Sequence, residues 1–520
     1  MMVTSPQVDN RSMLPVGAIA WYLAFLLLLV LLQSFWKDAL SGRDIALLNL
    51  LVPILFGAAN LLLGWKLVRQ SPMAIWNPLV WLLLACTLYY GLGQLIHLLG
   101  HPDSVARVNT LYFVDPSGLA RTNLLNTVCV LTIVAAYLAK VLMTKLGKGG
   151  VSSDVSTEAQ ERQGSREAKW AVIVFLSIGL PIKYFLQLPY DLGLLNWVLP
   201  GSIKYLGTLS GVAIIPLYWL YKKRGGIYPP MFFTLVASEA LVSLVTLSKL
   251  EMIKTALFLL LGAHLVKPGL KKLVIGGVLM IVVYVLVLNP FVTFARVAIK
   301  RAAASDLSQA MSLIEQYKKQ GGPIQDAEFP QAQLWWTRLA YSNVELFAMQ
   351  QYDRGRPGTT FQLAPYTLIP RFIMPEKPWM SPGFEFTNLI IGNPSIVSST
   401  GLGVPGEGYW NGGWLGAALV GVVVGILLAA FYQFSIRAMA VQVFMFLPIS
   451  MAGIFLGLRI DDWFVTTYLG MTAQLFLLYL VMQYVLRPIL IGNVNTTEHF
   501  VPDQRDTQEE DRRRFPVISR

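Results

Sequence analysis

Five cationic residues lie between positions 338 and 377, and four of them fall in 354–411, the part of the chain that is richest in proline and glycine. They are Arg338, Arg354, Arg356, Arg371 and Lys377, and Glu376 is the only acidic residue from position 354 to 377. A guanidinium group is a planar donor fork that suits phosphate, and an ammonium group is a compact positive charge. The set therefore predicts an anion-binding site. The alternative for any one member is pairing with a nearby carboxylate or a lipid headgroup.

Two segments with carboxylates follow the cations. Glu407 lies in a Gly-Glu-Gly triplet that is followed by Tyr409 and Trp410. Glycine permits a close approach between backbone and ligand, and a carboxylate is suited to take a proton from a hydroxyl group. Arg459 and Asp461 lie in a tight turn between the last two predicted spans, where charges are easily solvated. Aromatic residues around both segments fit the apolar face of a ligand such as a sugar, or else form an interfacial belt.

The composition indicates that these residues are held by a membrane scaffold. The chain has 520 residues, of which 55% are hydrophobic and 13% are charged. Soluble domains are about a quarter charged. The net charge of +12 comes mainly from cations at helix ends, which argues against a nucleic-acid partner. The first apolar run, 14–32, is interpreted as an uncleaved span, because it is long for a signal peptide and lacks a cleavage site.

Apolar runs of about 20 residues predict twelve membrane spans. They lie near 14–33, 45–65, 79–99, 123–143, 169–189, 203–221, 229–248, 252–266, 273–292, 413–434, 440–458 and 464–486. If the spans alternate, the basic connections 144–169, 222–224 and 267–272 share one side, which is predicted to be cytoplasmic, as are both termini. The opposite side then carries the connections 100–122, 190–202 and 293–412.

The fold class expected from this pattern is an all-α integral membrane protein with one large outer loop. Its parts are a four-span N-terminal bundle (1–143), a cytoplasmic linker (144–168), central spans (169–292), the outer loop (293–412), three C-terminal spans (413–486) and a disordered cytoplasmic tail (487–520). Within the loop we expect helices over Ala295–Gln320 and Gln331–Tyr352, and then an irregular Pro/Gly-rich segment. Glycines four residues apart, such as Gly421 and Gly425, favour close helix packing in lipid.

Several ionisable residues fall inside the predicted spans, and such residues are candidates for function. Lys183, Lys204, Lys249, Glu251 and Lys254 lie near outer span ends, where we expect long side chains to reach the interface. Glu239 and His264 lie deeper. Cys86 and Cys129 both lie within spans, which disfavours a disulfide, and the four histidines are too scattered for a metal site.

Four segments together resemble a known family. They are Arg338-Leu-Ala-Tyr-Ser-Asn-Val-Glu-Leu-Phe347, Gly358-Thr-Thr-Phe361, Ile369-Pro-Arg-Phe-Ile-Met-Pro-Glu-Lys-Pro378 and Gly406-Glu-Gly-Tyr-Trp-Asn-Gly-Gly-Trp-Leu-Gly416. The pattern is similar to that of the bacterial O-antigen and exopolysaccharide repeat-unit polymerases, often called Wzy-type polymerases. The similarity is carried by residues 334–416, and elsewhere it is one of topology.

The resemblance implies an enzyme on the periplasmic face of the bacterial inner membrane. It would join a growing glycan on one undecaprenyl pyrophosphate to the repeat unit on another, without a metal or other cofactor. Glu407 and Arg371 would be catalytic. The substrate-binding residues would be Arg338, Arg354, Arg356, Lys377, Glu376, Tyr409, Trp410, Arg459 and Asp461. A flippase and a chain-length regulator would be partners, together with membrane lipids.

Two other functions fit parts of the sequence. A lipid-linked oligosaccharide transporter or flippase would need a charge-lined route through the bundle, and the sequence has few central charges. An O-antigen ligase would share outer-loop arginines, but the resemblance leads us to expect an outer-loop histidine as well. Positions 293–412 contain no histidine, which favours the polymerase.

Overall fold

The computed structural model describes most of the chain as helix. The described residues are 14–36, 42–146, 157–195, 199–292, 331–369, 374, 376–378, 380–393, 398–440 and 442–491. These ranges contain α-, 3-10 and π-helical segments joined by turns, and they contain no strand. The predicted all-α class is therefore confirmed for this part of the chain. The helix expected over Ala295–Gln320 lies outside the described residues.

Ten of the described helical segments are long and apolar enough to cross a membrane. They are Val16–Phe35, Arg43–Gln70, Pro78–Leu99, Pro116–Thr144, Gln163–Asp191, Gly201–Arg224, Tyr228–Val245, Leu270–Val292, Val404–Ala440 and Phe464–Leu490. All ten coincide with predicted spans, so the chain is a multi-pass membrane protein. The two other predicted spans correspond to Lys249–Val266, which is a helix outside this set, and to the shorter apolar segment Phe444–Leu458. Twelve spans therefore stay a prediction.

The helices form two bundles and a cap. The first bundle contains α1 (Val16–Trp36), α2 (Gly42–Gln70), η1 (Pro72–Trp76), α3 (Pro78–Cys86), η2 (Thr87–Leu92), α4 (Ile96–Leu99), α5 (Pro102–Val108) and α6 (Pro116–Leu146). The second contains α7 (Thr157–Ile182), η3 (Lys183–Gln187), α8 (Leu188–Asp191), α9 (Gly201–Gly207), α10 (Leu209–Val212), α11 (Ile214–Arg224), α12 (Tyr228–Val245), α13 (Lys249–Val266), α14 (Leu270–Val283) and η4 (Tyr284–Leu288).

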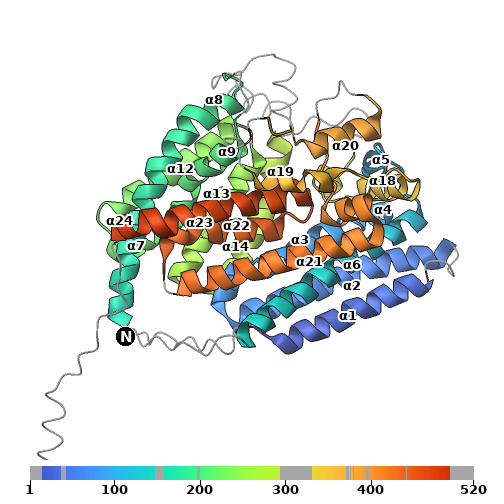
Figure 1. The fold of residues 1–520 in the computed structure, drawn as a ribbon, viewed down its shortest axis with the longest axis horizontal. Helices are drawn as coiled ribbons and strands as arrows, with labels where there is room; N and C mark the ends of the chain where they lie inside the picture. Colours follow the sequence, from blue (N-terminus) through green and yellow to red (C-terminus); the bar gives the residue numbers. More distant parts are fainter. Residues whose placement is uncertain are drawn as a thin grey trace, which may run out of the picture.

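The cap and the C-terminal helices complete the fold. The cap contains α17 (Leu334–Thr337), α18 (Ser342–Asp353), η5 (Thr360–Leu363), α19 (Ala364–Leu368) and α20 (Pro382–Ile391). The C-terminal helices are α21 (Val404–Ala440), η6 (Phe444–Phe446), α22 (Leu447–Leu458), η7 (Phe464–Leu469), α23 (Gly470–Val481), η8 (Met482–Leu486) and α24 (Arg487–Ile491). Helices α4, α5, α18 and α20 lie at the same end of the molecule, on the right in Figure 1.

Helix α21 joins the first bundle to the cap. A Cβ at Gly421 or Gly425 would overlap atoms of α6, so both glycines permit the close packing predicted for them. At its other end α21 changes direction, because Gly412 and Gly413 leave helical geometry and Gly413 has a φ of 61°. The first turns of α21, before Gly412, therefore contact α18 of the cap rather than continuing the long span.

The helix predicted over Gln331–Tyr352 is two helices, α17 and α18, separated by 338–341. The Trp336 indole donates a hydrogen bond to the Leu92 carbonyl at 2.6 Å, and a Cβ at Gly93 would overlap the Leu339 carbonyl oxygen. Backbone of the cap is thus seated directly on the end of η2. This tertiary contact overrides the helical periodicity of the sequence, and it leaves Arg338 outside both helices.

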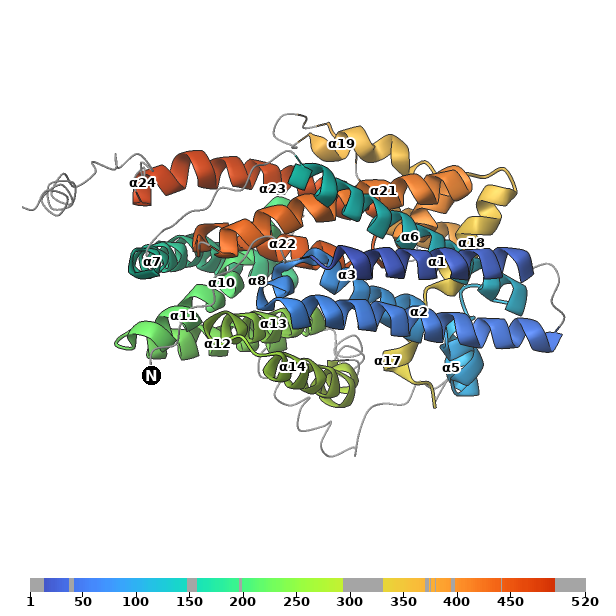
Figure 2. The same cartoon turned by 90° about the horizontal axis from the view of Figure 1, so that it is seen from below.

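The second bundle begins earlier than predicted. Helix α7 starts at Thr157, inside the region assigned to the 144–168 linker. Glu167 is buried and accepts a hydrogen bond from Arg487 Nε of α24 at 3.1 Å, which fixes the end of this polar stretch against the C-terminal helix. Helix α24 contacts α7, and Figure 2 shows α14 at the edge of the molecule next to α13. The side chains of α14 are mostly exposed, as expected for a helix that faces lipid.

Candidate functional site

A pocket of about 510 Å³ lies where the cap meets both bundles and the turn that follows α22. Its polar lining includes Arg107 of α5, Arg338 and Tyr341 of the cap, and Asp461 of that turn. Tyr89 of η2 and Tyr284 of η4 contribute aromatic rings. The pocket thus combines two guanidinium groups, a carboxylate and three phenol groups drawn from five separate segments of the chain.

Two residues of this pocket, Arg338 and Asp461, were predicted as substrate-binding. Arg338 is exposed. Tyr341 donates a hydrogen bond from its hydroxyl to Asp461 Oδ2 at 2.9 Å, and its ring packs edge-on against Tyr89 with centroids 5.4 Å apart. Sequence reasoning missed Arg107 and Tyr341. Arg107 was missed because it lies far from Arg338 in the chain. Tyr341 could have been found, because it belongs to the same ten-residue motif as Arg338.

The carboxyl group of Asp461 is suited to proton transfer. Its pKa is raised to about 6: burial is the main cause and the neighbouring Asp462 carboxylate adds to it, whereas the Tyr341 hydrogen bond and Arg459 lower the pKa. A general base works best when its pKa lies near the working pH. Asp461 therefore combines an accessible position in the pocket with a pKa that allows it to accept a proton near neutrality.

Arg459 is near this base without lining the pocket. Its guanidinium lies 3.6 Å from Asp462 Oδ2, and both side chains are partly exposed. The backbone N–H of Trp463 donates to Asp462 Oδ1 at 2.8 Å. Asp462 is thus engaged by the turn itself, and Arg459 supplies positive charge beside the two carboxylates. This arrangement fits a supporting position for Arg459 rather than direct contact with a ligand in the pocket.

Glu407, predicted as the catalytic base, is buried away from the pocket. The Thr360 hydroxyl donates to its Oε1 at 2.7 Å, and the Phe464 N–H donates to its Oε2. Asn411 adds a hydrogen bond from its amide to the Glu407 carbonyl at 2.9 Å. The carboxylate therefore ties three segments together with both of its oxygens. Its position favours a structural role and leaves Asp461 as the better candidate for the base.

The remaining predicted cations do not gather around Arg338. Arg354 and Arg356 are exposed near the far end of α18, a helix of 12 residues and hence about 18 Å long. Lys377 donates from Nζ to the Ile369 carbonyl at 2.9 Å, and Glu376 is exposed beside it. Arg371 lies outside the described residues. Of the four predicted cations that the structure describes, only Arg338 lines the pocket.

Tyr409 and Trp410, predicted to bind substrate, pack inside the cap. The Tyr409 hydroxyl donates to Asp353 Oδ1 at 2.9 Å, and Arg121 bridges the same carboxylate at 2.8 Å. The Trp410 ring packs edge-on against Phe386 with centroids 5.1 Å apart. Both aromatic residues are buried and pack in the core of the cap, which is neither of the two positions expected for them. Arg121 was missed because it lies in a different predicted connection, 100–122, more than 200 positions before Asp353.

A second buried carboxyl group, Glu345, was not predicted. It is fully buried on α18, where it accepts a hydrogen bond from Asn126 Nδ2 of α6 at 3.0 Å. Its other oxygen, Oε1, has no hydrogen-bond partner among the described residues. Burial raises its pKa to about 8, so the group holds its proton at neutral pH. Its place in the ten-residue motif with Arg338 was the signal available in the sequence.

The described residues hold no group of three histidine, cysteine or acidic side chains arranged for a metal. Comparison of the chain with protein-family models, with curated proteins and with solved structures gave no match. A function for this protein is consequently argued from the chemistry of its pocket, since an all-helical membrane architecture alone hosts many functions.

Proposed function

We propose that this protein is a membrane glycosyltransferase that polymerises lipid-linked oligosaccharide repeat units. The expected substrates are undecaprenyl-pyrophosphate-linked glycans, and the expected product is a cell-surface polysaccharide such as O-antigen, capsule or exopolysaccharide. The expected location is the periplasmic face of the bacterial inner membrane, with both termini cytoplasmic. A chain-length regulator and a flippase are the expected partners.

The observation that carries the proposal is the mixed chemistry of the pocket. Arg107 and Arg338 supply donor groups suited to a pyrophosphate, and Asp461 supplies a base beside them. The pocket borders Tyr284, which lies in a helix long and apolar enough to cross a membrane. A substrate with a polyprenol tail could therefore remain in lipid while its charged head enters the pocket.

The chemistry follows from these positions. The hydroxyl of the acceptor sugar attacks the anomeric carbon of the donor, and the bond from that carbon to the pyrophosphate oxygen breaks. Asp461 takes the hydroxyl proton, with Tyr341 holding the carboxylate in place. Arg338 and Arg107 stabilise the negative charge that develops on the departing pyrophosphate. Tyr89 and Tyr341 offer aromatic faces for the apolar side of a sugar ring.

The proposal is tested with purified protein and undecaprenyl-pyrophosphate-linked repeat units in detergent or liposomes. The wild type is expected to produce a ladder of longer glycans on a gel. Arg338→Ala is expected to shorten the ladder strongly, because the leaving group loses a charge that stabilises it in the transition state. Arg437→Ala is the matched control, since Arg437 is an exposed arginine near the opposite end of α21.

A ladder of wild-type length from both Arg338→Ala and Asp461→Asn, with the two variants folded, would rule out this pocket as the active site. A wild type that binds no undecaprenyl pyrophosphate by native mass spectrometry would rule out the substrate class. A ligase would make no ladder from repeat units alone, because it needs a different acceptor. The assay therefore separates ligase from polymerase.

A lipid-linked oligosaccharide transporter is the second candidate, because the membrane part contains a buried charged pair. Lys183 and Glu239 are both buried, whereas the sequence indicated few charges in the interior. A transporter would move a fluorescent lipid-linked oligosaccharide across a liposome bilayer without lengthening it. Movement without a ladder would favour this candidate over the polymerase.

A further inference from the structure

Six exposed cations lie at one end of the second bundle, apart from the pocket. They occur at the end of α11, directly after α13 and in the first turn of α14, and they are Lys222, Lys223, Arg224, Lys267, Lys271 and Lys272. The chain has no aspartate or glutamate from position 192 to 238 or from 252 to 305. The helix ends that carry these cations therefore bring no carboxylate with them.

The connections between the helices place the six cations side by side. Helices α11, α12 and α13 contact one another and are joined by the short connections 225–227 and 246–248, so α11 and α13 end on the same side, where α14 begins. Tyr218 of α11 packs against Gly262 of α13, where a Cβ would lie 3.3 Å from it. Lys222 follows Tyr218 by four residues and Lys267 follows Gly262 by five, so both lie about 6–8 Å beyond this contact. The six cations thus form one surface, the basic end.

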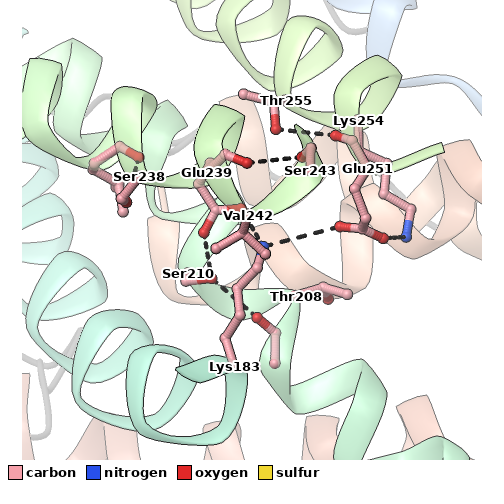
Figure 3. A network of polar contacts seen from close by, with 12 residues as sticks. Lys183, Thr208, Ser210, Ser238, Glu239, Val242, Ser243, Glu251, Lys254 and Thr255 are labelled. Atoms are coloured by element: carbon pink, nitrogen blue, oxygen red, sulfur yellow. Dashed lines mark hydrogen bonds and ion pairs between the residues drawn. The ribbon is translucent and has the colours of Figure 1, made fainter. Parts of the chain in front are cut away.

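Other charged side chains inside the second bundle are paired, unlike those of the basic end. Lys183, which was expected to reach the interface, is only 2% exposed and contacts both Glu239 of α12 and Glu251 of α13 (Figure 3). Glu251 also pairs with Lys254 at 2.7 Å. These four residues form a buried network in which both carboxylates are engaged. The network therefore supplies no counter-charge for the basic end.

Most cations of the basic end have no partner in the described part of the chain. Four of them make neither an ion pair nor a side-chain hydrogen bond there, namely Arg224, Lys267, Lys271 and Lys272. The ammonium of Lys222 lies over the Tyr221 ring, 4.2 Å from its centroid. Glu167 of α7, which packs against α11, is already paired with Arg487. Like charges gathered without a counter-charge repel one another, so this end of the bundle attracts anions.

Apolar side chains are exposed directly beside the basic end. Phe233 of α12 is 59% exposed, and Ile275 of α14 is 66% exposed. Both residues lie in helices that are long and apolar enough to cross a membrane. The rings of Tyr221 and Phe233 lie 5.9 Å apart, so aromatic residues border the cations, as is typical of a membrane interface. Such a surface fits an amphiphile with an anionic head and hydrocarbon tails better than a soluble anion.

We propose that the basic end is a binding site for the headgroup of an anionic phospholipid such as phosphatidylglycerol. The lipid phosphate accepts charge-assisted hydrogen bonds from Lys267, Lys271 and Lys272, and the acyl chains lie along the exposed sides of α12 and α14. No side chain caps the first turn of α14, and a helix N-terminus favours negative charge, so the phosphate also offsets the two lysines placed there. The site is independent of the function proposed for the pocket.

Native mass spectrometry of the detergent-solubilised protein with added lipid tests this site. The wild type is expected to retain phosphatidylglycerol in preference to phosphatidylcholine. A variant that combines Lys267→Gln, Lys271→Gln and Lys272→Gln is expected to bind phosphatidylglycerol about 10- to 100-fold more weakly, because each cation near a lipid phosphate contributes a factor of about five. An unchanged affinity in this variant, or no preference between the two lipids in the wild type, would overturn the proposal.

Two control variants separate the loss of these charges from other effects. The first loses three exposed cations elsewhere, through Arg354→Gln, Arg356→Gln and Arg437→Gln, and should bind phosphatidylglycerol as the wild type does. The second replaces the same three lysines of the basic end by arginine, which keeps the charge and should keep the binding. Equal weakening in the first control would show that lipid binding follows net charge and not the basic end. Weak binding by the folded arginine variant would show that charge is not what binds the lipid.

Two further measurements separate a lipid from a soluble anion and locate it. Soluble glycerol phosphate at the same concentration should not displace phosphatidylglycerol, because it has no acyl chains. In nanodiscs, phosphatidylglycerol with a photoreactive acyl chain should label α12 and α14 near 228–233 and 270–278 more strongly than α1, which also exposes apolar side chains. Displacement by glycerol phosphate would assign the site to a soluble anion. Equal labelling of all three helices would show that the lipid has no preferred position.

Discussion

The pocket and the buried network place charge in opposite ways. The pocket is bordered by arginines, and its Arg338 is exposed. The network inside the second bundle is built from lysines and glutamates, and its Lys183 is 2% exposed and held by Glu239. Arginine keeps its charge in any surroundings, which suits a permanent site for an anion. Lysine and glutamate keep or lose theirs according to their partners.

The difference shows that a charged residue is informative only together with its partner. Arg338 is exposed at the pocket, where a ligand can reach it, whereas Lys183 is buried and paired with Glu239 whether or not a ligand is present. Substitutions in the pocket should therefore affect activity more than stability, and substitutions in the network should affect stability first. The four predictions below test this contrast, from the largest expected effect to the smallest.

The largest effect is expected for Lys183→Met. Removing one partner of a buried ion pair leaves an uncompensated charge, which typically costs about 3–5 kcal/mol in the free energy of unfolding. The measurement is chemical denaturation in detergent. Lys183→Met combined with Glu239→Gln should recover much of the loss, since neither residue is then charged. A single variant as stable as the wild type would contradict the buried pairing.

The next effect concerns Asp461→Asn, which keeps the shape of the side chain but removes the base. The rate of glycan lengthening should fall by about 100-fold or more, because positioned general bases contribute roughly that amount. Asp462→Asn is the comparison, since Asp462 does not line the pocket and is engaged by Trp463 and Arg459. Equal losses in both variants would remove the distinction between the two carboxylates.

The third prediction concerns Glu345, which belongs to neither region. It is buried like Lys183, but one of its carboxyl oxygens has no hydrogen-bond partner among the described residues. Its pKa in the folded protein is about 8, above the ordinary value of 4.5, so the folded state holds a proton that the unfolded state releases between these values. Stability should therefore fall as the pH rises from 4.5 to 8, by up to about 1.4 kcal/mol per pH unit.

Glu345→Gln should make the free energy of unfolding less dependent on pH over that range, as measured by denaturation at a series of pH values. The amide keeps the contact to Asn126 and cannot ionise. If the free energy of unfolding depended on pH in the same way in the wild type and the variant, the Glu345 carboxyl group would be in contact with water in the folded protein. The effect per pH unit is smaller than the cost expected for breaking the Lys183 pair.

The smallest effect on stability is expected for Arg338→Ala. Exposed residues without a fixed partner usually change the free energy of unfolding by less than about 0.5 kcal/mol. The measurement is again denaturation in detergent, with Arg354→Ala as the comparison at the far end of α18. A loss as large as that of Lys183→Met would show that Arg338 has a structural partner, and it would remove the contrast between the two regions.

Much of the scaffold could be predicted, because a span of about 20 apolar residues is a local signal. All ten apolar segments fall on predicted spans, and the glycines at 421 and 425 pack against α6 as expected. The division of the 331–352 helix could not be predicted, since it depends on the contact of Leu339 with Gly93. The burial of Glu167 on α7 likewise involves the distant Arg487, which the sequence does not place beside it.

The candidate site could be predicted only in part for the same reason. Arg338 and Asp461 were found because residue type alone suggests their chemistry. Arg107 lines the same pocket, whereas Glu407 does not. Neither position could be predicted, because both depend on how segments hundreds of positions apart meet at one end of the bundle. Lys183 was expected at the membrane interface because it lies near the end of a predicted span. The sequence does not show that Glu239 of a neighbouring helix lies beside it.

Gly93 has a consequence that reaches beyond packing. It carries no functional group and does not line the pocket, yet the carbonyl of Leu339 rests where its side chain would be. Leu339 follows Arg338 directly, so even a methyl group at position 93 would displace the backbone next to this pocket residue. The absence of a side chain at position 93 thus determines how closely the backbone that carries Arg338 approaches the end of η2.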